Sequence, residues 1–247
     1  MRINPVARLA AGIVVALGIV WSIDPVSAGV ALVLELALFP LLRIPLRVFW
    51  TRTALIWIAA PLTGLTVLLY GRVSGVSYLD WAFVHITDGS IQLAVAGTIR
   101  VLALALPTVV LLIGVDPTEL ADGLAQRVKL PARFVIGALA AARLVGLLRE
   151  DARMLELARR ARGVGDRGRF RRFAGLAFAV LVLAVRRGSA LATAMEARGF
   201  GGPGPRSWAR DSAFGAREWA LLAIAVVVAG VAVLAAVLTG WWTPVVG

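Results

Sequence analysis

The chain has 247 residues, of which 60% are apolar and 16% charged, whereas soluble domains average roughly 45–50% and about 25%. Its mean hydropathy is +0.87, and several runs approach the roughly 20 apolar residues that cross a bilayer. These values exclude a soluble enzyme and a free nucleic-acid-binding protein. Because a lone span in lipid must satisfy its own backbone hydrogen bonds, we expect an all-α integral membrane protein.

The charge of the chain limits the kinds of partner it can bind, and its cysteine content limits the kinds of site it can form. Lys and Arg outnumber Asp and Glu by 26 to 14, and Lys129 is the only lysine. The basic residues gather between the apolar runs, which indicates contact with an anionic leaflet or an acidic protein partner and no binding of nucleic acid. Because the chain has no cysteine, disulfides, thiolate metal sites and a cysteine nucleophile are excluded.

Hydropathy predicts about five transmembrane helices, at residues 6–21, 26–42, 53–70, 91–114 and 219–238. Arg43, Arg47 and Arg52 follow the second of them, and 19 of the 26 basic residues lie between 116 and 217. The positive-inside rule then places the N-terminus in the cytoplasm and the C-terminus outside. The high content of Ala, Arg and Gly is typical of a GC-rich bacterial genome, so we expect a multi-pass protein of the bacterial cell membrane.

Two further apolar runs, 131–148 and 173–185, lie within the basic stretch. The second has 13 residues, roughly 20 Å of helix, which is short for a hydrocarbon core of about 30 Å. If both runs crossed the membrane, the arginines between 159 and 172 would be exported, against the positive-inside rule. We therefore expect both runs in the cytoplasmic interfacial layer, buried against other helices, although insertion of 131–148 stays open.

This gives three parts: a four-helix transmembrane part at 1–115, a cytoplasmic or interfacial region of amphipathic helices at 116–216, and a final span with an external C-terminus at 217–247. Asp116 and Pro117 are a typical helix start, with the acid at the cap and proline in the first turn. That helix is expected to end near Arg127. Two longer helices are expected to end at Gly163 and Gly199.

The ends of these two longer helices are alike. Residues 158–163 and 194–199 both have the sequence Ala-x-x-Ala-Arg-Gly, 36 residues apart. An arginine followed by glycine is a good helix stop, because the cation complements the helix dipole and glycine adopts the left-handed cap conformation. Two copies with matching alanines favour a second interpretation, in which each arginine docks in an acidic groove of a cytoplasmic partner.

The paired Ala-Arg-Gly motifs resemble those of the transmembrane scaffold subunit, or T component, of energy-coupling factor (ECF) transporters, which are ABC-class importers of vitamins and metal ions. Residues 4–9, Asn-Pro-Val-Ala-Arg-Leu, are similar to the opening motif of that family. Residues 194–200, Ala-Met-Glu-Ala-Arg-Gly-Phe, followed by Arg206, are close to its second Ala-Arg-Gly signature. The resemblance covers nearly the whole chain and is strongest between 116 and 211.

The resemblance implies a non-catalytic subunit that joins two cytoplasmic ABC ATPase subunits to one small membrane substrate-binding (S) subunit. It implies an ATPase-docking role for six residues, with Arg162 and Arg198 central. They are Ala161, Arg162, Gly163, Ala197, Arg198 and Gly199. The transported compound, a vitamin or a transition-metal ion such as cobalt or nickel, would be set by the S subunit and stays open.

The chain lacks the residues for ATP hydrolysis of its own, because a P-loop needs Gly-Lys-Ser/Thr and Lys129 lies between Val128 and Leu130. We expect no cofactor, no catalytic set and no metal site, and we interpret His85 as a solvated or interfacial residue. Glu35 and Arg100 lie inside predicted spans, where they could pair, snorkel or line a path. The alternative function is a membrane-embedded enzyme or assembly factor with a basic cytoplasmic face, which would act without an ATPase partner.

Overall fold

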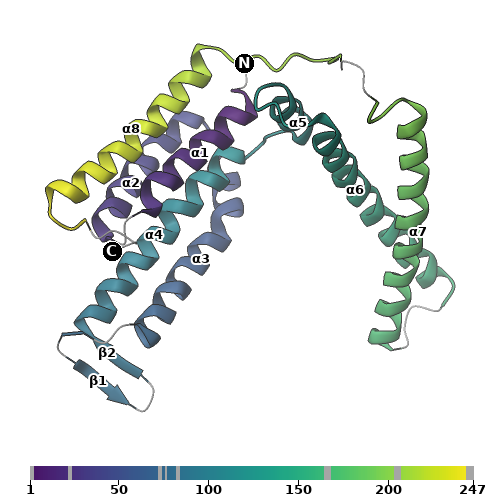
Figure 1. Cartoon of the computed structure of the whole chain (residues 1–247). Coiled ribbons are helices and arrows are strands. Elements are labelled where there is room, and N and C mark those ends of the chain that lie inside the picture. The colour runs from purple at the N-terminus through teal and green to yellow at the C-terminus, as the bar shows by residue number, and fades with distance from the viewer. Residues whose placement is uncertain are drawn as a thin grey trace. The chain divides into compact units, whose positions relative to one another are not determined.

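In the computed structural model the chain forms two compact units, the bundle (1–116 with 213–247) and the α5–α7 unit (117–212) (Figure 1). The structure describes residues 3–21, 24–71, 74–75, 77–81, 84–163, 168–202 and 207–242. The bundle contains the helices α1 (Pro5–Val20), α2 (Pro25–Leu38), α3 (Leu46–Tyr70), α4 (Asp88–Leu112) and α8 (Ala216–Leu238), and a short 3-10 helix, η1 (Phe39–Leu42).

Local sequence sets where the bundle helices begin. The side chains of Asn4 and Asp24 accept hydrogen bonds from the backbone N–H groups of the first turns of α1 and α2, and each is followed by a proline. Both arrangements satisfy the N–H groups that a helix start leaves without a partner. Thr87 and Ser90 form a reciprocal capping box at the start of α4.

Small residues bring the bundle helices close together. Helix α4 packs against α1, α2 and α3, while α8 packs against α1 and α2. A Cβ added to Gly64 in α3 would collide with Thr98 Oγ1 of α4, and one added to Gly18 in α1 would lie 2.5 Å from the Cβ of Ala229 in α8. Close backbone approach at small residues is how helices associate in lipid, where the hydrophobic effect gives no net drive.

One end of the bundle gathers four chain segments. Asn4 N–H donates to Glu218 Oε1 at 3.0 Å, and the Asn4 side-chain amide donates to Ala213 O at 2.8 Å. Arg8 Nη1 lies 3.5 Å from Ile113 O. The starts of α1 and α8 and the end of α4 therefore meet at this end, together with the connection from η1 to α3. We call it the basic end, since Arg8, Arg43 and Arg47 belong to it.

A β-hairpin between α3 and α4 was not predicted from the sequence. Strands β1 (Ser77–Trp81) and β2 (Val84–Thr87) pair antiparallel, with Asp80 opposite His85. In the predicted topology this segment is the connection between the third and fourth spans. Its residues from 77 to 87 include Tyr, Trp, Val, Ile and Thr, which favour strands, but the run is too short to give a clear alternating pattern.

The α5–α7 unit consists of α5 (Pro117–Gln126), α6 (Ala132–Ala161) and α7 (Arg169–Ala197). Its helices end where the sequence predicted, near Arg127, at Gly163 and at Gly199. The end of α5 holds the segment that leads back to the bundle. Gln126 Nε2 donates to Arg210 O at 2.8 Å, and its Oε1 accepts from Ser212 N–H at 2.9 Å.

The prediction of an all-α integral membrane protein with about five spans is confirmed, since five described helices are long and apolar enough to cross a membrane. The members of that set differ from the prediction. Helix α1 has 16 residues and falls short of a full span, whereas α7 qualifies over Phe170–Ala197. The apolar run 173–185 is short for a span, but the helix expected to end at Gly199 is 29 residues long and includes basic residues on both sides of that run.

The expectation that 131–148 and 173–185 are buried against other helices was wrong within this chain. Val135 is the only buried residue described in α6, and no described residue of α7 is buried. Large apolar side chains such as Phe134, Phe173 and Phe178 are exposed. These surfaces are therefore available to lipid or to other subunits.

Candidate functional site

The two Ala-Arg-Gly helix ends have the same backbone geometry. Arg162 follows the last residue of α6 with φ −88° and ψ 6°, and Arg198 follows the last residue of α7 with φ −91° and ψ 12°. The next residues, Gly163 and Gly199, have φ of +69° and +74°. Only glycine adopts this left-handed region without strain, so each glycine ends its helix and turns the chain directly after the arginine.

Hydrogen bonds fix both ends. Gly163 N–H donates to Arg160 O at 3.0 Å, and Gly199 N–H donates to Glu196 O at 2.9 Å. At the second end Phe200 N–H also donates to Met195 O at 2.9 Å, which completes a Schellman motif. The corresponding residue of the first end, Val164, lies outside the described residues, as does Arg206.

All six residues predicted for docking are exposed. Within the part of the chain that the structure describes, the guanidinium groups of Arg162 and Arg198 make no ion pair or hydrogen bond. The last turn of each helix has a surface without protruding side chains at its alanines, which are residues 158 and 161 in α6 and 194 and 197 in α7. Each helix end thus presents one cation on a flat, uncovered surface, which suits a protein groove with acidic side chains.

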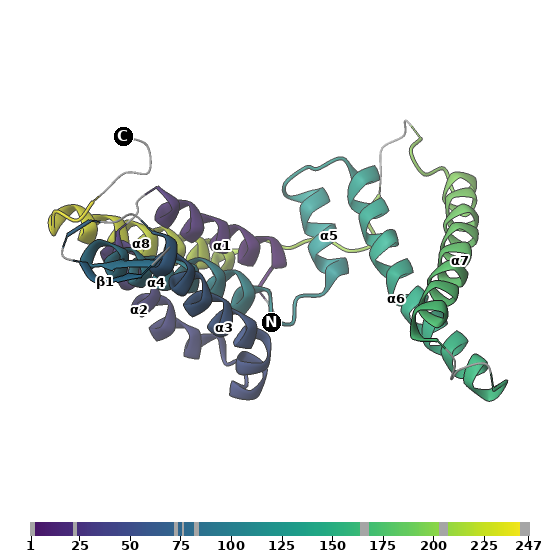
Figure 2. The same ribbon diagram turned by 90° about the horizontal axis from the view of Figure 1, so that it is seen from below.

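The structure does not bring the two arginines together. Three contacts show that α6 and α7 run antiparallel: Arg187 pairs with Asp151 at 2.8 Å, Arg172 pairs with Glu156 at 3.1 Å, and Arg159 Nη2 donates to Gly175 O at 2.9 Å. Residues further along α6 meet residues earlier in α7 (Figure 1, Figure 2). Since both motifs are C-terminal, they lie at opposite ends of the helix pair. A helix of 30 residues is roughly 45 Å long.

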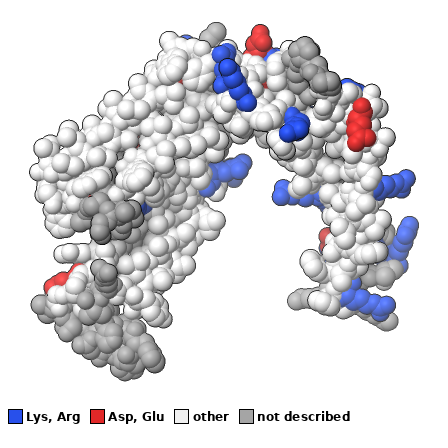
Figure 3. All heavy atoms as spheres, viewed as in Figure 1, with Lys and Arg blue, Asp and Glu red and all other residues white. Residues whose placement is uncertain are grey.

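These tertiary contacts were not predictable from the sequence, because two oppositely charged residues on different helices have no characteristic spacing along the chain. Glu156 also pairs with Arg160 at 2.7 Å, so one carboxylate contacts a cation on each helix. Near the second motif, Pro131 at the N-cap of α6 and Arg133 in its first turn line a cavity of about 720 Å³ together with Arg198 and Phe200. Basic side chains project from the α5–α7 unit, whereas the bundle presents a mostly uncharged face in Figure 3.

Comparison with known proteins identifies the family. The model of the CbiQ family, described as cobalt transport protein, matches residues 1–208. The chain belongs to the CbiQ family. A curated relative, the energy-coupling factor transporter transmembrane protein EcfT of Limosilactobacillus fermentum, is 27% identical over 207 residues, which covers 78% of this chain and 76% of the relative.

For this CbiQ-family chain, the predicted resemblance to the T component of ECF transporters is therefore confirmed. The chain is an energy-coupling transmembrane component of a transporter and a multi-pass membrane protein. This membership implies ATPases and a substrate-binding subunit as partners. The matched region includes both Ala-Arg-Gly helix ends.

Among the described residues of this CbiQ-family member, Glu35 and Arg100 make no hydrogen bond to each other. Arg100 Nη2 donates to Val20 O at 2.6 Å, at the end of α1. Glu35 is 4% exposed, and neither of its carboxylate oxygens accepts a hydrogen bond among the described residues. Among those residues there is no group of three His, Asp or Glu side chains that could hold a metal ion. The side chain of His85 lies outside them.

Proposed function

We propose that the chain is the non-catalytic scaffold of an ECF-type importer, and that it joins two cytoplasmic ATPase subunits to one substrate-binding membrane subunit. The observation that carries this proposal is the placement of two equivalent Ala-Arg-Gly ends at opposite ends of one antiparallel helix pair. Two motifs side by side would serve a single binding site. Two motifs separated by about the length of a helix suit two equivalent sites on a pair of ATPases.

The docking residues in this proposal are Arg162 and Arg198, each flanked by the small residues of its motif. A guanidinium group forms bidentate hydrogen bonds with a carboxylate. The neighbouring alanine and glycine let the helix end approach the partner backbone closely. Loss of one partner from such a desolvated pair costs about 2–5 kcal/mol of association free energy, which is at least about a 25-fold loss of affinity.

The helix pair is suited to transmit motion of the ATPases. The ion pairs of Asp151 and Glu156 connect the two helices along the half of α6 next to Gly163. When ATP draws the ATPases together, both motif ends move with them, and the pair turns as one body. The coupling region, 116–216 in our proposal, then tilts the substrate-binding subunit.

An apolar surface of the helix pair supports a place for that subunit. A cavity of about 420 Å³ between α6 and α7 is lined mainly by aliphatic side chains, including Ile136, Leu139, Leu144 and Leu191. A membrane subunit that presents an apolar face would cover it. In this proposal the substrate is a vitamin or a transition-metal ion that the S subunit binds.

We propose that the basic end of the bundle faces the cytoplasm of a bacterial cell and that the β-hairpin faces outward. Arg8 and Arg43 at one end, with Arg47 and Arg52 in the first turns of α3, support this orientation by the positive-inside rule. The ATPases would then lie on the side of the membrane where ATP is present.

Charge reversal tests the docking role. Arg162→Glu combined with Arg198→Glu should release the ATPases from the detergent-solubilised complex, because each substitution places a carboxylate against an acidic groove. The control is Arg153→Glu combined with Arg186→Glu, which makes the same charge change at exposed arginines of α6 and α7 outside the motifs. Equal retention of the ATPases by both double variants would exclude the docking role.

A further inference from the structure

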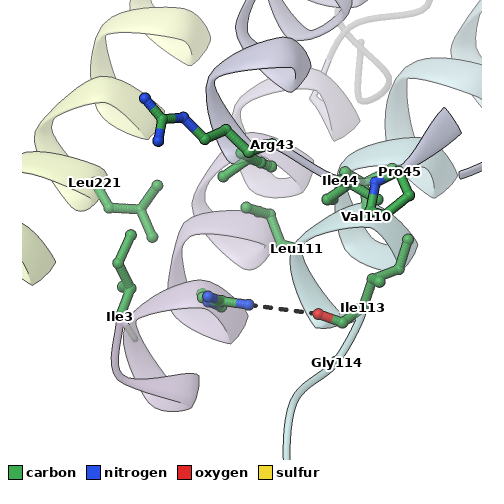
Figure 4. Close-up of a pocket in the computed structure, with 11 residues that line it drawn as sticks. Ile3, Arg43, Ile44, Pro45, Val110, Leu111, Ile113, Gly114 and Leu221 are labelled. Carbon is green, nitrogen blue, oxygen red and sulfur yellow. Dashed lines mark hydrogen bonds between the residues drawn. The ribbon is translucent and has the colours of Figure 1, made fainter. Parts of the chain in front are cut away.

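Two arginines of the bundle line a cavity of about 260 Å³ at its basic end (Figure 4). Arg8 of α1 and Arg43 of the η1–α3 connection line it, together with apolar residues that include Ile3, Ile44 and Leu221. Among the residues that line the cavity in the described structure there is no acidic side chain. Its net positive charge suits an anion.

The backbone at Arg43 supports a role for this side chain. Arg43 has φ +50° and ψ 37°, a left-handed conformation that is uncommon outside glycine and strained for an L-residue. Glycine or asparagine would end η1 with less strain. Arginine at this position places a cation beside the cavity, and a strained residue of this kind is common at ligand sites.

The cavity continues into an apolar groove. Leu42, Leu111 and Leu221 line both the arginine cavity and a neighbouring one, whose other residues are almost all apolar and include Leu38, Leu41 and Ile224. Leu41 is 71% exposed and Ile224 43% exposed, so the groove is open along the surface of the bundle. In a membrane-spanning bundle this surface faces acyl chains.

We propose that this site binds one anionic phospholipid, with its phosphate between Arg8 and Arg43 and an acyl chain along the groove of Leu38, Leu41 and Ile224. Charge complementarity and the continuity of the two cavities together favour an anionic lipid. A soluble anion would leave the apolar groove unfilled, and a neutral lipid would leave the charge of the arginines uncompensated. Basic pockets between transmembrane helices on the cytoplasmic side hold anionic headgroups in this way. The bound lipid would bridge α1, α4, α8 and the start of α3, and so hold the basic end together.

The test is native mass spectrometry of the full-length chain in detergent with phosphatidylglycerol or with phosphatidylcholine of the same acyl chains. The wild-type chain should retain one phosphatidylglycerol in preference to phosphatidylcholine. Arg8→Gln and Arg43→Gln should each weaken retention about five-fold, which corresponds to about 1 kcal/mol for each cation near an anionic lipid. Arg47→Gln, the same charge change on α3 at a residue that does not line the cavity, should leave it unchanged.

Two further measurements separate the headgroup from the acyl chain. Ile224→Trp should fill the groove and reduce retention of phosphatidylglycerol with both arginines in place. Glycerophosphoglycerol, the headgroup without acyl chains, should not displace the lipid. Displacement by that compound would show a site for a soluble phosphate and overturn the lipid assignment. Equal retention by the wild-type chain and Arg43→Gln would overturn the whole proposal, whichever partners the Ala-Arg-Gly motifs bind.

Discussion

The glycines after Arg162 and Arg198, the arginines proposed to dock the ATPases, test whether the motif needs its last residue. Gly163 and Gly199 have φ of +69° and +74°, and a Cβ added to either would meet no atom within 4 Å. Substitution by alanine therefore creates no clash. Its effect comes only from the backbone, because an L-residue with a Cβ is strained in the left-handed region.

That strain amounts to roughly 1–2 kcal/mol for each position. If the ATPase binds the helix end in the left-handed conformation seen here, the bound state of Gly199→Ala carries this strain energy. The free energy of association is then less favourable by the same amount, and affinity falls about 5- to 30-fold. Gly163→Ala should have a similar effect, and because the two sites are far apart the effects should add. Asparagine tolerates this conformation better than alanine, so Gly199→Asn should recover most of the affinity.

The assay is ATPase binding to each variant in detergent or nanodiscs, measured as a dissociation constant. Gly188→Ala is the matched control, because Gly188 lies within α7 and a Cβ there meets open space. It should bind ATPase as the wild-type chain does, since alanine favours a helix interior. Equal affinities for Gly199→Ala, Gly199→Asn and Gly188→Ala would refute the argument that the left-handed cap positions the arginine.

Three other predictions concern the bundle and its orientation. Glu35→Leu should raise the apparent Tm in detergent by at least about 2 °C, because it replaces a buried carboxylate that has no hydrogen-bond partner among the described residues with an apolar side chain. A lower Tm would mean that the carboxylate has a partner. Gly64→Val should lower the Tm by forcing α3 and α4 apart, whereas Gly97→Ala, in open space on α4, should not; equal Tm values would contradict close packing at Gly64. In intact cells a membrane-impermeant maleimide should label Thr239→Cys but not Ser207→Cys, because the proposed topology places these residues on opposite sides of the membrane. Each variant has a single cysteine, since the chain itself has none. The reverse labelling pattern would show that the topology is inverted.

The helix ends were predictable because their signals are local. Pro117 in a first turn, and an arginine followed by Gly163 or Gly199, each act on their own turn of helix. The long apolar helices α3, α4 and α8 were predictable because hydropathy reports the lipid environment directly. Family membership was predictable from the motifs at residues 4–9 and 194–200.

Contacts between residues far apart in the sequence could not be predicted. The pairing of Asp151 with Arg187 depends on how α6 and α7 align, and no spacing along the chain encodes it. The end of α7 at Gly199 was predicted, but its suitability as a membrane span was missed because only the apolar run 173–185 was counted toward a span. The expected burial of 131–148 and 173–185 was wrong because apolar surface can be covered by lipid or by another subunit as well as by the chain itself.

The most direct test of the scaffold account is the composition of the complex isolated from the native membrane in mild detergent. Native mass spectrometry should find one copy of this chain with two ABC-type ATPase subunits and one small polytopic membrane protein, and the ligand released from that protein would identify the substrate. A complex that retains one ATPase subunit for each copy of the chain would contradict the use of both helix ends. A chain that purifies with no ATPase would contradict the central claim.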